Sequence, residues 1–184
     1  VREIDALGGF CGIVSDLTAI QFRMLNRSKG PAMWSPRSQA DRQKFSEKWR
    51  SILENTDNLD IWQDMVTELI VKDGAVCGVK VGMSAVFEAK CVVITAGTFL
   101  SGLMHCGKTQ VAGGRISEPA SYGLTEQLNL LGVRSDRMKT GTPVRIDGRS
   151  VDFSVMGKQD GDNDFHKFSY LDFDPRPLEQ KSCF

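Results

Sequence analysis

The sequence predicts an α/β fold, and three observations support this. Before residue 56, apolar residues recur every three or four positions in two stretches, which is the spacing of amphipathic helices. Between residues 60 and 95, three short runs rich in β-branched residues alternate with turn sequences, which is typical of strands. The last of these runs ends at Thr95-Ala96-Gly97, so a glycine directly follows a predicted core strand.

Length and charge set the first limits. The 184 residues allow one domain, or one domain and part of another. Lysine plus arginine equal aspartate plus glutamate, at 23 each, so net charge indicates neither nucleic acid nor a membrane. No apolar run approaches the about 20 residues that cross a bilayer, and no signal-peptide pattern opens the chain. We therefore expect a cytoplasmic protein without a membrane partner. The start at Val1 predicts a piece of a longer protein.

The cysteines and histidines do not predict a metal site. The five cysteines are scattered without a C-x-x-C pair, and His105 lies far from His166. A zinc site needs about four close nitrogen or sulfur ligands. Reduced thiols in a cytoplasmic protein are the expected state, and Cys91 is predicted to lie in the core.

The first 55 residues predict helix, strand and helix. One apolar stripe runs from Ile4 to Leu17. The next segment alternates, with Ile20, Phe22 and Met24 on one face of a predicted strand. The sequence NRSKGP then breaks that strand, and a second helix is predicted from about residue 38 to residue 55.

An antiparallel meander is predicted next. Its three runs cover residues 60–71, 75–81 and 85–95, and the turn sequences KDG and GMS separate them. The meander leads into the core strand that ends at Thr95. After Gly97 the chain is loop-rich as far as Pro119. Ser121 is then predicted to cap a helix that ends at Gly132, and residues 133–148 are predicted to form strand, turn and strand.

Residues Gly102 to Thr109 fit the P-loop pattern G-x-x-x-x-G-K-[ST]. A P-loop needs a strand that leads straight in and a helix that starts at its lysine. Here the predicted strand ends too early, and Gly113, Gly114 and Pro119 would not sustain a helix. The match therefore predicts a surface loop, with a P-loop nucleotidase as one rival function.

Several longer motifs occur in a consistent order. They are VREIDALGG, AIQFRMLNRSKGP, SPRSQADR, VVITAGTFLSG, GGR, EPAS, RMKTGTPVRIDG and VDFS. Together they resemble the MnmG (GidA) family and cover essentially the whole chain. Ala19 stands where the family has glycine, and Val144 stands where it usually has a second proline.

The resemblance implies a function for a parent protein. That family uses FAD, with NADH as reductant, to add the carboxymethylaminomethyl group to C5 of the wobble uridine of certain tRNAs. It implies the GTPase MnmE as partner, a homodimer and a cytoplasmic location. The family's glycine-rich pyrophosphate loop and its catalytic cysteines are absent from this sequence, so we expect an interior fragment that is inactive alone.

The resemblance also refines the fold. It implies part of a two-dinucleotide-binding, FAD Rossmann-like domain over residues 1–149, with the meander inserted at about residues 59–90. Residues 150–184 would begin a truncated insertion domain. Val66 resembles the residue whose backbone meets the FAD adenine, and Ser121 resembles a second FAD contact. Thr95, Ala96 and Gly97 are expected to line the FAD cleft by analogy with the fold. No residue of the chain is expected to be catalytic.

Several cations are candidates for RNA contacts: Arg27, Lys29, Arg37, Arg42, Arg137, Lys139 and Arg145. On a strand, Arg137 and Lys139 would share one face. The competing interpretation is a solvated strand face, because charge runs alone say little about ligands. Two further functions remain open: a folate-dependent tRNA uracil methyltransferase of the same superfamily, and a non-catalytic fragment that binds RNA or a partner protein.

Overall fold

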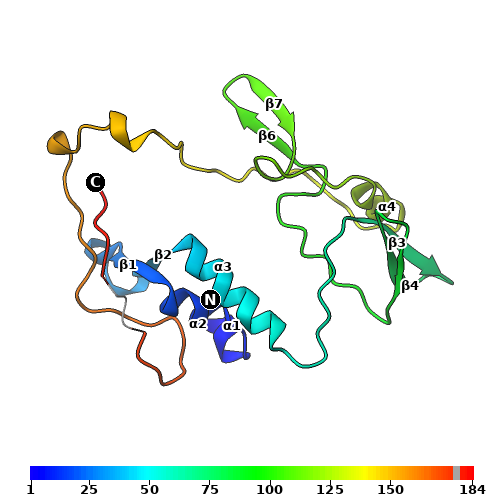
Figure 1. Ribbon diagram of the computed structural model, residues 1–184, viewed down its shortest axis with the longest axis horizontal. Coiled ribbons are helices and arrows are strands. Elements are labelled where there is room, and N and C mark those ends of the chain that lie inside the picture. The colour runs from blue at the N-terminus through cyan, green and yellow to red at the C-terminus, as the bar shows by residue number, and fades with distance from the viewer. Residues whose placement is uncertain (176–178) are drawn as a thin grey trace. The chain divides into compact units, whose positions relative to one another are not determined.

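The computed structural model describes residues 1–175 and 179–184 (Figure 1). The chain divides into two compact units, one made of Val1–Ile61 with Ile146–Phe184 and the other of Trp62–Arg145. Helices occur together with three small antiparallel sheets in this described part, which confirms the α/β class. No helix among the described residues is both long and apolar enough to cross a membrane.

The first unit begins with two short helices, where one helix over residues 4–17 was predicted. Its helices and strands are α1 (Arg2–Ala6), α2 (Cys11–Leu17), β1 (Ala19–Leu25), β2 (Ser35–Ala40) and α3 (Arg42–Glu54), with 3-10 turns η1 (Arg27–Lys29), η2 (Pro31–Met33), η3 (Gly148–Ser150) and η4 (Phe153–Val155). Gly8 adopts a φ of +89°, and the N–H of Gly9 donates to the carbonyl of Ile4. This glycine stop ends α1 and divides the predicted helix.

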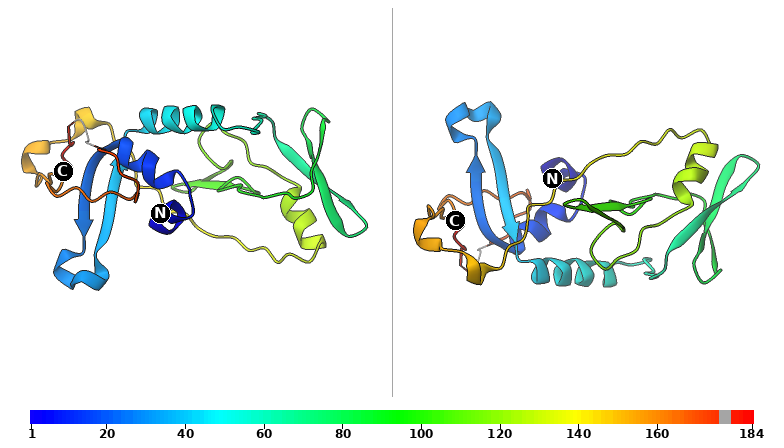
Figure 2. Two further views of the ribbon diagram at one scale, coloured as in Figure 1. Left: turned by 90° about the horizontal axis from the view of Figure 1, so that it is seen from below. Right: turned by 90° about the horizontal axis from the view of Figure 1, so that it is seen from above.

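Strand β2 is a correction to the sequence prediction, which started a helix at residue 38. Residues 35–40 instead pair with β1 in antiparallel register, for example Arg23 with Arg37. Figure 2 shows η1 and η2 at the tip of this two-stranded ribbon. Helix α3 starts only at Arg42, because the carboxylate of Asp41 caps it by accepting the N–H groups of Gln43 and Lys44.

The C-terminal segment completes the core around β1. Phe22 is fully buried, and its ring meets the ring of Phe165 edge to face at 5.0 Å between centroids. The free edge of β1 is covered by irregular chain: the N–H of Asp162 donates to Phe22 O at 2.8 Å, and the N–H of Lys181 donates to Ile20 O at 2.6 Å. Gln21, predicted on the opposite face from Phe22, is also buried, because this segment lies against that edge.

The second unit contains the predicted meander, which is confirmed. Strands β3 (Val66–Lys72), β4 (Ala75–Val81) and β5 (Val86–Glu88) pair antiparallel in the order β3-β4-β5. Asp73 and Gly74, in the predicted KDG turn, both have positive φ. This is the requirement of a type I′ hairpin turn, whose twist matches that of the flanking strands.

A helix and a hairpin complete the second unit. Helix α4 (Leu124–Leu130) packs on β3, where the amide of Gln127 donates to Leu69 O and accepts from Leu69 N, each at 2.7 Å. Gly132 ends the helix as predicted, with a φ of +85°. Strands β6 (Leu103–Cys106) and β7 (Thr109–Ala112) form the third sheet.

Two predicted strand regions are irregular. Residues 91–96 form no strand, Cys91 is exposed rather than in the core, and Val93 is 83% exposed. Residues 133–147 likewise carry no regular element before η3. A strand is stable only where its N–H and C=O groups find a partner strand, and in the described part of the chain neither region has one.

Candidate cofactor-binding site

The loop after the irregular segment is shaped by two tight turns. The N–H of Phe99 donates to Ala96 O at 3.0 Å, and the N–H of Gly102 donates to Phe99 O at 3.2 Å. Gly97 lies in the first turn with a φ of +55°, a conformation that suits glycine. Among the described residues other than its two chain neighbours, none has an atom within 4 Å of the position that a Cβ of Gly97 would take. The backbone there is open to an approaching molecule. We call residues 96–102 the glycine loop.

Ser121 joins the glycine loop to the meander. Its N–H donates to Phe99 O at 2.8 Å, and its carbonyl accepts from the N–H of Ser101 at 2.7 Å. Its hydroxyl reaches the other way and donates to Val66 O at 3.4 Å, where β3 begins. The structure therefore brings together Val66, Ser121 and the loop that carries Ala96 and Gly97. Thr95 precedes this loop and is exposed.

Ser121 does not cap a helix, so that prediction is wrong. Helix α4 begins at Leu124, with Gly123 as its N-cap residue. The carboxylate of Glu126 accepts the N–H of Gly123 at 3.0 Å. A side chain of the helix itself therefore accepts the N–H of its N-cap residue, and Ser121 instead links the glycine loop to the start of β3. Ser121 therefore lies outside the N-terminus of α4, and its predicted FAD contact cannot rest on a helix end.

Two further contacts hold the glycine loop. The hydroxyl of Thr98 donates to Gly114 O at 2.8 Å. The guanidinium of Arg137 donates to Ser101 O at 3.0 Å. Sequence reasoning did not find the role of Ser101 or of Gln127, because a positive φ at a serine and a side-chain contact to a distant strand leave no local pattern.

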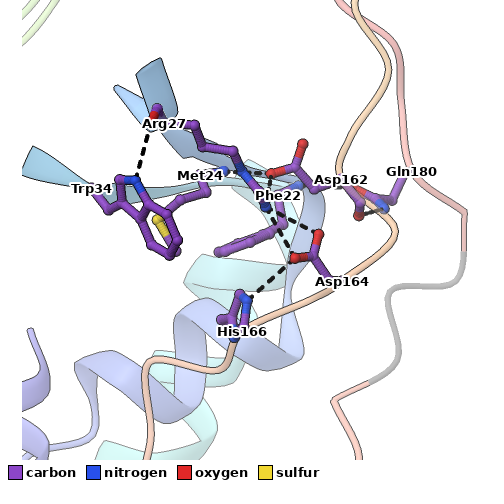
Figure 3. A network of polar contacts seen from close by, with 8 residues as sticks. All are labelled: Phe22, Met24, Arg27, Trp34, Asp162, Asp164, His166 and Gln180. Carbon is purple, nitrogen blue, oxygen red and sulfur yellow. Dashed lines mark hydrogen bonds and ion pairs between the residues drawn. The ribbon is translucent and has the colours of Figure 1, made fainter. Parts of the chain in front are cut away.

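Two of the residues predicted to contact RNA, Arg27 and Arg37, already have side-chain partners within the first unit. Arg27 pairs with Asp162 and Asp164, each at 3.0 Å (Figure 3). These carboxylates raise the pKa of Arg27, chiefly through the hydrogen bond to Asp164, and that bond lowers the pKa of Asp164. Arg37 turns inward and donates to Oε1 of Gln21 at 2.8 Å. A phosphate would have to compete with these partners.

The other cationic candidates differ in setting. Lys29 lies in η1 and Arg42 opens α3, and both are exposed. Lys139 and Arg145 are exposed on irregular chain. The predicted strand face shared by Arg137 and Lys139 does not exist, because residues 133–147 form no strand. Arg137 contacts the glycine loop instead.

The sequence favoured a surface loop over a P-loop at residues 102–109, and the structure agrees. Gly107 and Lys108 form the two-residue turn between β6 and β7, with Cys106 paired to Thr109. Gly107 has a φ of +61°, which fits the first position of a type II′ turn. A strand, not a helix, follows Lys108, so the loop lacks the helix N-terminus that a phosphate would need.

The chain matches a known family over its full length. A family model described as glucose inhibited division protein A covers residues 1–184. Proteins named tRNA uridine 5-carboxymethylaminomethyl modification enzyme MnmG, from Parabacteroides distasonis and Phocaeicola vulgatus, are 68% and 64% identical over 184 residues. This chain spans 29% of the length of each.

A solved structure agrees with these matches. GidA of Aquifex aeolicus, in one crystal form, is 42% identical with a TM-score of 0.87. The similarity covers 98% of this chain and 31% of that one. The agreement of sequence and structure over nearly the whole chain shows that it belongs to the glucose inhibited division protein A (GidA, MnmG) family.

Proposed function

We propose that the protein containing this chain is a flavoenzyme that adds the carboxymethylaminomethyl group to C5 of the tRNA wobble uridine. The observation that carries this proposal is the name of its relatives, which are modification enzymes of tRNA uridine at up to 68% identity across all 184 residues. That name favours this reaction over the folate-dependent methylation and the non-catalytic fragment considered from the sequence.

FAD is the proposed cofactor, with NADH as reductant. Bound FAD would supply the redox chemistry, while residues of this chain would hold and orient it. The open backbone at Gly97 supports such a role, because a flat ring or ribityl chain can approach there without meeting a side chain. The backbone of Val66 would meet the adenine, Ser121 would form a second contact, and Thr95 and Ala96 would flank the cofactor.

The remaining features of the proposal follow the family resemblance. The parent protein would contain a Rossmann-like FAD domain that includes residues 1–149, and an insertion domain that begins at residue 150. Residues 176–178 of that second range lie outside the described residues. Lys29, Arg42, Lys139 and Arg145 are the exposed cations that could face tRNA phosphates. We also propose that the parent protein is a homodimer, that the GTPase MnmE is its partner, and that it acts in the cytoplasm.

Analysis of tRNA nucleosides tests the proposed reaction. Inactivation of the gene that contains this chain should remove 5-carboxymethylaminomethyl derivatives of the wobble uridine, as measured by mass spectrometry of digested tRNA. Restoring the gene should restore them. The purified complete protein should also show a flavin absorbance band. Unchanged wobble uridines in the inactivated strain would refute the proposal.

Gly97→Val in the complete protein is expected to weaken FAD binding about ten- to hundredfold. A β-branched residue in the left-handed region is strained by about 1–2 kcal/mol, and its side chain would enter the open face. Titration with free FAD measures the change. Gly107→Val is the matched control, because Gly107 also has a positive φ but lies at the β6–β7 turn. The position that a Cβ of Gly107 would take is likewise open, with no described residue other than its chain neighbours within 4 Å. Equal flavin affinity in the two variants would remove Gly97 from the cofactor site.

A further inference from the structure

Ser101, in the glycine loop, has two features that are unfavourable in free energy. It adopts a φ of +46°, which is unfavourable for any residue with a side chain. Its hydroxyl oxygen is buried without a hydrogen-bond partner in the described part of the chain. Something else must therefore hold Ser101 in place.

Hydrogen bonds of the backbone N–H and C=O groups of Ser101 hold it in place. The N–H of Ser101 donates to Ser121 O at 2.7 Å, and its carbonyl accepts the guanidinium of Arg137 at 3.0 Å. The first bond joins the loop to Ser121, whose hydroxyl contacts Val66 O. The second bond reaches 36 residues along the chain. The glycine loop is thus fixed on one side by backbone and on the other by a charged side chain.

Arg137 reaches Ser101 from a segment without regular structure. Its own N–H donates to the carboxylate of Asp136, which is a local contact. Arg137, like Lys139, is exposed, and its bond to Ser101 lies at the surface. A charge-assisted hydrogen bond is nevertheless stronger than a neutral one, so Arg137 is suited to stabilise a strained loop from outside. Lys139, two residues later, is exposed and makes no such contact in the described part of the chain.

We propose that Arg137 is a positioning residue for the cofactor, rather than the RNA contact that its charge suggests. It holds the carbonyl of Ser101, and through Ser101 it sets the glycine loop against Ser121. This inference rests on the proposed function for the identity of the ligand, but the loop-holding role can be measured without any ligand.

Arg137→Met in the complete protein tests the proposal, because methionine keeps an unbranched side chain and removes every donor. Hydrogen exchange should become faster in peptides that contain the amides of Phe99, Ser101, Gly102 and Ser121. The Kd for FAD should rise about tenfold, while the thermal midpoint stays unchanged. Arg137→Lys should recover most of both effects, because lysine retains a charged donor of similar length.

Lys139→Met is the matched control and should leave loop exchange and FAD affinity as in the wild type. Equal exchange in the Arg137 and Lys139 methionine variants would overturn the proposal. Faster exchange with unchanged FAD affinity would also overturn it, since the loop would then not position the cofactor. If the wild-type protein bound no FAD, the proposed function would fail, and the exchange comparison would still decide whether Arg137 holds the loop.

Discussion

Phe22→Ala is expected to lower the free energy of unfolding by about 3–5 kcal/mol, the usual range for a buried phenylalanine. The side chain is 0% exposed and packs edge to face on Phe165. Its removal would leave a cavity at the junction between β1 and the C-terminal segment. Urea denaturation, followed by far-UV circular dichroism, measures the loss.

A second phenylalanine of the same unit provides the control. Phe10 is 44% exposed, so Phe10→Ala should cost far less than Phe22→Ala. Because Phe22 contacts the C-terminal segment, its loss should also speed hydrogen exchange near Phe165. Similar destabilisation in the two variants would contradict the assignment of Phe22 to the centre of this core.

Asp16→Ala is expected to destabilise the protein by about 2–5 kcal/mol. The carboxylate of Asp16 is fully buried and accepts the backbone N–H groups of Phe168 and Ser169 at 2.9 to 3.0 Å. Alanine would leave both donors without a partner, and a buried unpaired donor costs about 1–3 kcal/mol. Asp16→Asn should cost less, because the amide oxygen can still accept. Urea denaturation would compare the free energies of unfolding of the three proteins. Equal stability of the alanine variant and the wild type would show that the hydrogen bonds to Asp16 do not stabilise the fold.

The same residue should make stability depend on pH. Burial raises the pKa of Asp16 above its ordinary value; the hydrogen bonds from Phe168 and Ser169 and the charge of Lys167 oppose this rise, and Asp5 adds to it. The folded state therefore holds the proton more tightly than the unfolded state. The stability from this proton is fully present below the ordinary pKa of an aspartate, about 4, and is lost as pH rises through the raised pKa.

The expected result is a difference between two proteins across one pH range. As pH falls from 7 toward 4, the wild type should gain stability relative to Asp16→Asn, which has no proton to bind at this site. Urea denaturation at several pH values measures that difference. A difference that stays constant across this range, or that favours the variant at low pH, would contradict the raised pKa.

Local chemistry explains what the sequence predicted correctly. The type I′ turn at Asp73-Gly74 and the helix end at Gly132 depend on a few adjacent residues that tolerate positive φ. The meander follows from short β-branched runs that these turns connect. The order of the motifs from VREIDALGG to VDFS likewise predicted the family that the comparisons show.

Elements that depend on distant partners were predicted less well. Residues 92–95 have strong strand propensity, yet they form no strand because no described strand pairs with them. Residues 38–40 were predicted as helix, yet they form a strand because β1 offers a partner. Whether a segment becomes a strand is decided by hydrogen bonds to another segment, which its own sequence does not encode.

The same distinction, between what local sequence predicts and what distant partners decide, holds for the candidate site. The sequence by itself determined that Gly97 would be a bare backbone position and that Val66 and Ser121 were candidates for the cofactor, since these depend on residue type and motif. Only the tertiary structure decided that Ser121 links the glycine loop to Val66, that Arg27 and Arg37 have partners of their own, and that Arg137 holds Ser101. The physical reason is that a side chain's hydrogen-bond partners depend on which distant segments fold beside it, and those contacts form only when the whole unit packs.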